Sequence, residues 1–193
     1  MAFLDFLKAL FARKADQKPA AAVGTGSAKQ RTAIAALALS AAALVGIATR
    51  EGYTDKAIIP TTGDVPTLGF GMTQRADGTP VKLGDQTNPV QALQRTLAYI
   101  QRDEAKIKQC VTAPLYQAEY DLYLNFAYNI GIGGFCGSTL VKKLNAGDYV
   151  GACNAILDWR KAAGYDCSTP GNKRCAGLWT DRQKTHAQCM ALQ

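Results

Sequence analysis

The sequence predicts an α+β fold, in which a small antiparallel hairpin lobe lies beside a mainly helical lobe with a cleft between the two. Two short apolar stretches, 57–59 and 65–70, flank turn-forming residues, and strands are expected only within about 57–72. Beyond that region the apolar residues recur at helical spacing. With 193 residues the chain can bury one sizeable core, but not two ordinary domains.

The longest helix is expected over 91–111, where apolar side chains recur every three, four or seven residues between Pro89 and Pro114. Shorter helices are expected near 116–129, 138–145, 149–158 and 178–191. The composition, with 19% charged and 8% aromatic residues, excludes a disordered chain, a collagen-like repeat and a coiled coil.

An uncharged, alanine-rich segment, residues 33–48, lies between Arg31 and Arg50. As a helix it would reach about 24 Å, less than the roughly 30 Å core of a bilayer, so it is a marginal membrane span. A buried core helix and a signal peptide cleaved after Ala48 are the alternatives. Residues 1–48 hold six basic and two acidic residues, and the rest holds 16 and 13, which predicts a cytoplasmic N-terminus and an exported body.

Residues 1–14 place apolar side chains at helical spacing among charged ones, which is typical of an amphipathic helix on a membrane surface. A small packed helix explains the same spacing equally well. Residues 15–31 are predicted to form a flexible linker. The low net charge of the remaining chain argues against nucleic-acid binding and favours approach to an anionic cell envelope.

All six cysteines lie beyond residue 109 and no C-x-x-C pair occurs, which disfavours a structural zinc site and suggests disulfides formed outside the cytoplasm. Cys167 and Cys175 flank a turn-forming stretch, so a local disulfide is predicted there. Fifteen pairings are possible in principle, and reduced, buried cysteines are the alternative. The other two pairs are guessed as Cys110 with Cys136 and Cys153 with Cys189.

Glu51 directly follows the apolar segment and is expected to end a helix at the mouth of the hairpin. The returning strand carries Thr67, and Asp64 lies in or next to the turn. A carboxyl group at an apolar helix end is a candidate general acid with a raised pKa. The alternative is a solvated charge at the end of a membrane helix.

These residues stand in a distinctive pattern: REGY, with TLGFG beginning sixteen residues after the glutamate. The pattern resembles the catalytic signature of phage lysozymes of the T4 type, glycoside hydrolase family 24. The run from Tyr120 to Cys153, with FAYNIG, STL and LNAGDY, resembles the helical half of phage endolysins of this family, and GLWTDRQKTHAQC resembles their closing helix. The resemblance covers roughly residues 49–190 and implies a lysozyme-like fold.

Carried over to this sequence, the resemblance implies that Glu51 is the general acid and that Thr67 is the threonine of the catalytic triad. The middle member stays open. The family's spacing, six residues before Thr67, falls on Thr61, whereas Asp64 is the one carboxylate of the turn and is either the catalytic member or a turn residue. Asn129 matches a polar residue that lines the cleft and would bind substrate, although it also suits a helix C-terminus.

The resemblance further implies a phage endolysin that cleaves the β-1,4 bond between N-acetylmuramic acid and N-acetylglucosamine, without metal or other cofactor. The weakly apolar segment resembles the signal-anchor-release segment of exported endolysins. The implied division is 1–31, cytoplasmic segment and linker; 32–49, releasable membrane anchor; 50–193, catalytic domain. The expected partners are peptidoglycan glycan strands and, transiently, the host inner membrane, with the monomer then acting in the periplasm. A lytic transglycosylase and a non-catalytic peptidoglycan-binding module are the alternatives.

Overall fold

The computed structural model describes residues 30–60 and 63–193. Its elements are η1 (Ile34–Ala36), α2 (Ala41–Glu51), β1 (Thr54–Ile58), β2 (Thr67–Gly69), α3 (Pro89–Cys110), α4 (Gln117–Ile130), α5 (Ile132–Gly137), α6 (Thr139–Asn145), α7 (Tyr149–Asn154), η2 (Ala155–Asp158), β3 (Lys161–Ala162), β4 (Tyr165–Asp166) and α8 (Ala176–Met190). The α+β prediction is confirmed. The expected amphipathic segment, nearly all of the linker, and Thr61 lie outside the described residues.

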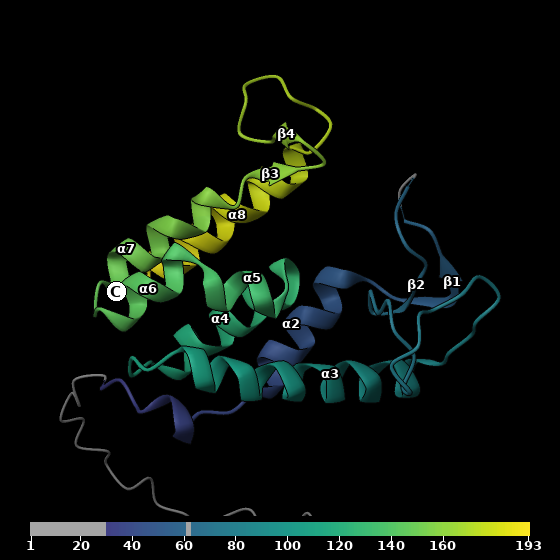
Figure 1. Ribbon diagram of the computed structural model, residues 1–193, viewed down its shortest axis with the longest axis horizontal. Helices are drawn as coiled ribbons and strands as arrows, with labels where there is room; N and C mark the ends of the chain where they lie inside the picture. Colours follow the sequence, from purple (N-terminus) through teal and green to yellow (C-terminus); the bar gives the residue numbers. More distant parts are fainter. Residues whose placement is uncertain (1–29, 61–62) are drawn as a thin grey trace, which may run out of the picture. The chain divides into compact units, whose positions relative to one another are not determined.

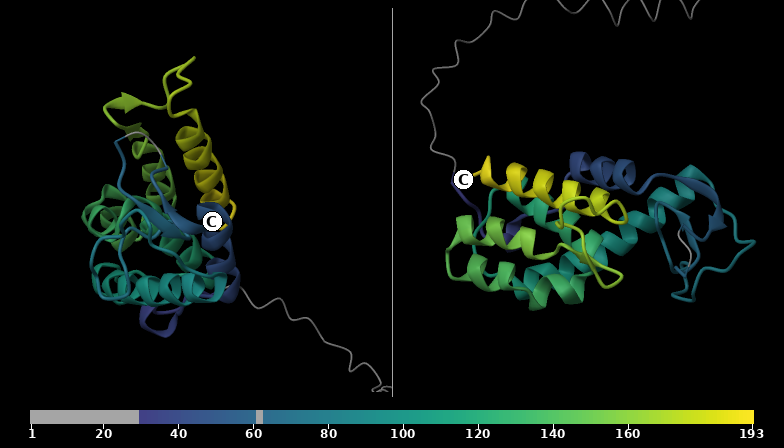
Figure 2. Two further views of the ribbon diagram at one scale, coloured as in Figure 1. Left: turned by 90° about the vertical axis from the view of Figure 1, so that its right-hand side faces the viewer. Right: turned by 90° about the horizontal axis from the view of Figure 1, so that it is seen from above.

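Helix α3 connects the hairpin lobe to the helical lobe (Figure 1). It begins at Pro89, whose fixed φ suits the first helical turn, and the Asn88 side chain caps it by accepting a hydrogen bond from the Gln91 backbone N–H at 2.9 Å. The perpendicular views show the β1–β2 hairpin near one end of α3 and helices α4 to α8 toward the other (Figure 2). This long helix therefore sets the spacing between the lobes.

Strands β1 and β2 pair antiparallel, with Thr54 opposite Gly69 and Ile58 opposite Thr67. The hairpin lies where the sequence predicted, although β1 begins at Thr54, earlier than the apolar stretch alone indicated. Gly69 has a φ of 65°, and a Cβ there would lie 2.8 Å from the Cβ of Ala92 on α3. Only glycine allows the hairpin to approach the helix so closely.

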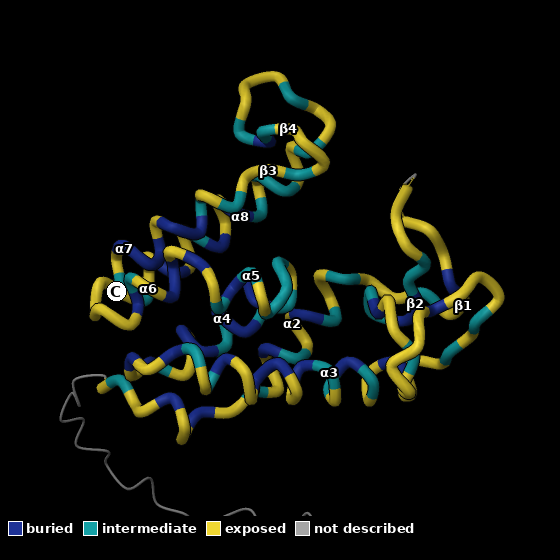
Figure 3. Tube along the Cα trace, viewed as in Figure 1, coloured by how far each residue is buried: buried dark blue, intermediate teal, exposed yellow. Residues whose placement is uncertain are grey.

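A second hairpin, β3–β4, contradicts the expectation that strands occur only within 57–72. Its strands have two residues each and are joined by Ala163 and Gly164, which have φ values of 48° and 81°. Two successive residues with positive φ are characteristic of a tight two-residue hairpin turn. Strands this short have no alternation of apolar residues that a sequence could reveal. Most of this region is exposed (Figure 3).

Disulfide bonds cross-link the helices of the helical lobe. Cys110 is bonded to Cys136, which joins α3 to α5, and Cys153 is bonded to Cys189, which joins α7 to α8. Cys167 is bonded to Cys175 in the loop before α8. These are the pairs suggested from the sequence, and none of the six cysteines is free. The largest fully buried side chains include Tyr120, Tyr123, Phe126, Phe135, Leu140 and Leu144.

The apolar segment 33–48 does not form the single helix of 16 residues expected from its composition. A short 3-10 turn, η1, is followed by extended residues, and α2 begins only at Ala41. The Ser40 hydroxyl caps α2 by accepting a hydrogen bond from the Ala43 backbone N–H at 3.1 Å. In the described part of the chain, no helix combines the length and the apolar character needed to cross a bilayer.

Contacts with acidic side chains hold the segment in this broken form. The backbone N–H groups of Leu39 and Ser40 donate hydrogen bonds to the carboxylates of Glu104 and Asp121 at 2.9 and 3.2 Å. These N–H groups lie where the chain is extended, so no intrahelical carbonyl is available to them. The break therefore depends on carboxylates supplied by α3 and α4.

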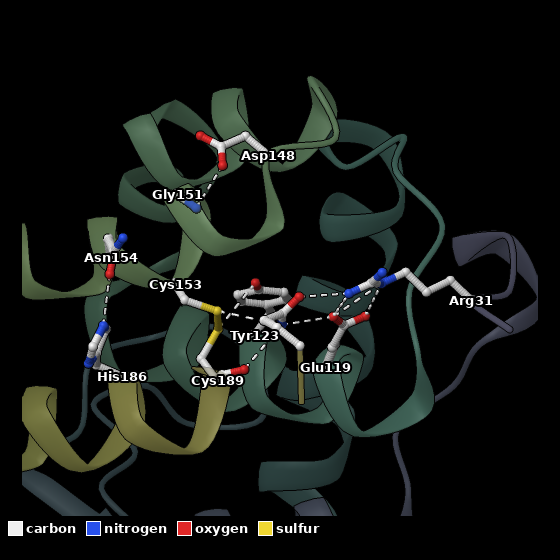
Figure 4. The surroundings of a disulfide bond; sticks show 10 residues. Arg31, Glu119, Tyr123, Asp148, Gly151, Cys153, Asn154, His186 and Cys189 are labelled. Carbon is white, nitrogen blue, oxygen red and sulfur yellow. Dashed lines mark hydrogen bonds and ion pairs between the residues drawn. A yellow bond between two sulfur atoms is a disulfide. The ribbon is translucent and has the colours of Figure 1, made fainter. Parts of the chain in front are cut away.

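The residues just before the apolar segment are also anchored. Thr32 and Leu115 exchange two backbone hydrogen bonds of 2.8 Å. The Arg31 guanidinium donates to both carboxylate oxygens of Glu119, at 2.7 and 2.9 Å, and lies over the Tyr149 ring, 3.6 Å from its centroid. Figure 4 shows this pair beside the Cys153–Cys189 disulfide. The start of the segment is thus fixed to the helical lobe.

Candidate active site

Glu51 is the last residue of α2, as the sequence predicted, and the chain turns toward β1 at Gly52, whose φ is 68°. Its side chain is half-buried. Burial raises the pKa of the Glu51 carboxyl, the positive charge of Arg50 lowers it, and the negative charge of Asp181 raises it, with a net increase. A carboxyl group that retains its proton to higher pH than usual is suited to act as a general acid.

Gly71 lies directly against the Glu51 carboxyl group. A Cβ on Gly71 would be 2.7 Å from Glu51 Oε2, and the φ of Gly71 is 71°, in a region that favours glycine. Residue 71 is the last glycine of the TLGFG motif. Gly71 therefore gives the carboxyl group room. The motif contains this glycine, but the sequence alone does not reveal its role.

Tyr128 on α4 connects the helical lobe to the hairpin lobe beside Glu51. Its hydroxyl donates a hydrogen bond to the backbone carbonyl of Phe70 at 3.1 Å. Burial raises the pKa of Tyr128, and the negative charge of Glu51 raises it further. Tyr128 was not among the residues predicted from the sequence, although it belongs to the FAYNIG run.

The hairpin carries the other proposed members of the triad. Thr67 is the first residue of β2 and is half-buried, and its hydroxyl donates to the Ile58 carbonyl at 3.4 Å. Asp64 is exposed between the two strands, where its Oδ1 accepts the Val65 backbone N–H at 2.9 Å. Asp64 thus lies next to the turn, as expected. Among the described charges, those that act on the Glu51 carboxyl belong to Arg50 and Asp181.

A chain of polar side chains extends from the end of α2 to α4 and α8. Arg50 forms an ion pair with Asp181 at 3.0 Å, and Asp181 also pairs with Arg182 at 2.8 Å. Arg182 is buried, with 3% of its surface exposed. Its guanidinium donates to the backbone carbonyl of Trp159 at 3.0 Å and to the Asn129 Oδ1 at 2.6 Å. The candidate substrate-binding residue Asn129 is therefore held by α8.

The described residues contain no group of three or more histidine, cysteine, aspartate or glutamate side chains that could hold a metal ion. What the arrangement does contain is a half-buried acid, a tyrosine bound to the opposite lobe and an exposed amide held by a buried arginine. These groups suit proton transfer to a leaving oxygen and hydrogen bonding to a polar substrate.

The model of the family described as phage lysozyme matches residues 48–185. The chain belongs to the phage lysozyme family. The endolysin of Salmonella phage P22 is 35% identical over 112 residues, which cover 58% of this chain and 76% of that protein. The SAR-endolysin of Escherichia phage N15 is 37% identical over 131 residues, which cover 63% of this chain and 69% of that protein.

A similar fold is found in solved structures. The endolysin from Escherichia coli O157:H7 phage FAHEc1 has a TM-score of 0.68 and 30% sequence identity, over 80% of this chain and 94% of that one. The family match and these relatives make this phage lysozyme a glycoside hydrolase and a phage lysis enzyme. The expected enzyme class and the lysozyme-like fold are thereby confirmed.

Proposed function

We propose that this phage lysozyme is a family 24 endolysin that cleaves the β-1,4 bond between N-acetylmuramic acid and N-acetylglucosamine in peptidoglycan, with Glu51 as the general acid. The observation that carries the proposal is the half-buried Glu51 carboxyl at the end of α2, whose pKa is raised. Cleavage of a glycosidic bond requires a protonated group on the leaving oxygen. A carboxyl group that retains its proton meets this requirement.

The second half of the reaction needs a group that reacts at the anomeric carbon. In the proposed mechanism Asp64 and Thr67 hold a water molecule on the opposite face of the sugar, and the product has inverted configuration. In the alternative mechanism the 6-hydroxyl of N-acetylmuramic acid attacks instead and leaves a 1,6-anhydro end. Asp64 lies next to the hairpin turn, three residues before Thr67. The first mechanism gives Asp64 the role of holding the water molecule, whereas the second mechanism gives it no role.

The proposed activation follows from the position of Glu51. Residues 32–49 act as a releasable anchor in the host inner membrane, with residues 1–31 on the cytoplasmic side and 50–193 outside. The name of the relative from phage N15 supports this, since SAR denotes signal-anchor-release. Because α2 includes the second half of the anchor and ends at Glu51, the acid has no support until α2 packs against α4. Release into the periplasm, for instance on loss of the proton-motive force, then forms an active monomer.

Digestion of purified peptidoglycan tests the catalytic proposal. The wild type and Glu51→Gln are compared, and the muropeptide masses identify the new ends. We expect reducing muramic acid ends from the wild type and a loss of about 100- to 10,000-fold in Glu51→Gln, the usual contribution of a general acid. Anhydro-muramic ends would establish the transglycosylase instead. A folded wild type that binds but does not cleave would support the non-catalytic binding module.

Lysis timing in the host tests the activation proposal. We expect that replacing residues 32–49 by a strongly hydrophobic span, which cannot leave the membrane, abolishes lysis while the protein is still exported. The matched control is a substitution of equal length that retains the alanine-rich, weakly apolar composition. Unchanged lysis with the permanent anchor would contradict activation by release.

A further inference from the structure

Asn129 is held in one orientation by its contact with Arg182. A guanidinium group has N–H donors and no acceptor, so the atom of Asn129 that faces it at 2.6 Å is the side-chain oxygen. The amide nitrogen, Nδ2, then points away from Arg182. Among the described residues none accepts a hydrogen bond from Nδ2, and Asn129 is exposed. The side chain therefore presents its NH2 donors to whatever binds there.

Arg182 is held firmly enough to impose this orientation. Only 3% of its surface is exposed. Its guanidinium is bound to the Trp159 carbonyl at 3.0 Å and to Asp181 at 2.8 Å, and lies 5.1 Å from the centroid of the Phe126 ring. Rotation of the Asn129 amide would place an NH2 group against this buried cation. Two donors would then face each other without an acceptor, which is unfavourable beside a buried guanidinium.

Two chains of contacts connect Asn129 to the proposed acid. Tyr128, the neighbour of Asn129 in the chain, bonds to the hairpin at the Phe70 carbonyl, next to Gly71, against which the Glu51 carboxyl packs. On the other side of Asn129, Arg182 is paired with Asp181, which is paired with Arg50, the residue before Glu51. Both connections from Asn129 thus lead to the catalytic end of α2.

We propose that Arg182 is a positioning residue that makes Asn129 a dedicated hydrogen-bond donor, and that this donor recognises the carbonyl oxygen of an N-acetyl group on the bound glycan. The proposal rests on the proposed function, and it adds which chemical group of the substrate Asn129 recognises. A sugar nitrogen without its acetyl group is an ammonium at neutral pH, which offers no acceptor and is repelled by Arg182. The enzyme should therefore discriminate against de-N-acetylated glycan.

Asn129→Asp is the sharpest test, because aspartate keeps the shape and the contact with Arg182 but has no donor. Binding is measured in the Glu51→Gln background, so that the result does not depend on cleavage. The probes are soluble glycan strands freed of peptides by an amidase, and the same strands after de-N-acetylation. We expect Asn129→Asp to weaken binding of the acetylated strands by about three- to tenfold, the value of one hydrogen bond, and to weaken binding of de-N-acetylated strands not at all.

Two further variants complete the experiment. Asn154→Asp makes the same amide-to-carboxylate change at an exposed asparagine that faces His186 at 2.9 Å, and it should change neither affinity. Arg182→Lys cannot make the same set of contacts, so the ratio of the two affinities should fall toward one. That ratio is insensitive to a lower folded fraction, which reduces both apparent affinities equally.

The proposal is overturned if Asn129→Asp weakens both glycans equally, or if Arg182→Lys retains the full preference for acetylated strands. With otherwise native Glu51, kcat/KM on the same two glycans should follow the binding ratios. Binding that shows the acetyl preference without any cleavage by the wild type would refute the proposed catalytic function and leave the role of Asn129 intact.

Discussion

Two arginines flank the apolar segment in the sequence, and the structure surrounds them with different environments. Arg31, before the segment, pairs with Glu119 at 2.7 Å, and the Glu119 side chain is fully buried. Arg50, after the segment, pairs with Asp181 at 3.0 Å, where the two side chains remain 26% and 29% exposed. In sequence the two arginines are equivalent flanking charges. In the structure the carboxylate of the first pair is enclosed by protein, although Arg31 itself is 22% exposed, whereas both members of the second pair are partly open to water.

The difference shows how burial decides what an ion pair does. A buried carboxylate that loses its partner keeps its desolvation cost, so the Arg31–Glu119 pair has a large effect on stability when broken. An exposed pair is worth little to stability. The charges of the Arg50–Asp181 pair nevertheless act on the half-buried Glu51 carboxyl: Arg50 lowers its pKa and Asp181 raises it. The enclosed pair therefore holds the fold, and the exposed pair acts on the acid.

The largest expected effect follows from breaking the Arg31–Glu119 pair. Arg31→Met keeps an unbranched side chain over the Tyr149 ring but leaves the Glu119 carboxylate buried without its cation. We expect the free energy of unfolding to fall by about 3 kcal/mol, measured by urea denaturation of the full chain at pH 7. The matched control, Arg50→Met, should cost less than about 1 kcal/mol. Equal losses of unfolding free energy in the two variants would show that the burial of Glu119 does not make its ion pair more important for stability.

The next effect concerns the room available to the acid. Gly71→Ala would place a methyl group 2.7 Å from Glu51 Oε2 and would strain the backbone at a φ of 71°. The displaced carboxyl should reduce kcat by about 10- to 100-fold, measured on purified peptidoglycan. Gly133→Ala is the control, because nothing lies within 4 Å of a Cβ there. Full activity in Gly71→Ala would mean that the position of Glu51 is not critical.

A smaller effect tests the exposed pair. The negative charge of Asp181 raises the pKa of Glu51, so Asp181→Asn should lower that pKa. A general acid is inactive once deprotonated, and the basic limb of the pH–activity profile should therefore move to lower pH. Arg50→Gln removes a charge that lowers the same pKa, and its basic limb should move to higher pH. Shifts in the same direction in both variants would contradict the assignment.

The smallest expected effect is the change in the free energy of unfolding when Glu51 itself is replaced. The folded state raises the pKa of Glu51 above its unfolded value, so the folded protein binds the proton more tightly. The stability this contributes is present below the unfolded pKa and is lost as pH rises through the folded pKa. Glu51→Gln should therefore increase the free energy of unfolding at pH 7 relative to wild type, and less at pH 4. A variant less stable than wild type at pH 7 would contradict a desolvated carboxyl.

Several features of the site could be predicted because their signals are local. Glu51 ends a helix and Thr67 begins the returning strand, both within the short motif that contains them. The Cys167–Cys175 disulfide joins two cysteines with a sequence separation of 8, and the turn between them is visible in the sequence. The hydrogen bond from Tyr128 to the Phe70 carbonyl was not predictable, since the two residues are 58 positions apart in the sequence. No local signal connects residues so far apart.

The sequence by itself determined the α+β class, the longest helix, the main hairpin and the end of α2 at Glu51. Prolines, caps, glycines and apolar periodicity act over a few residues, so they can be recognised without the rest of the chain. Only the tertiary structure decided that the apolar segment breaks before Ser40, that Arg31 pairs with the buried Glu119 and that Arg182 orients Asn129. Each of these depends on carboxylates or amides from distant elements, whose burial exists only once the chain has folded.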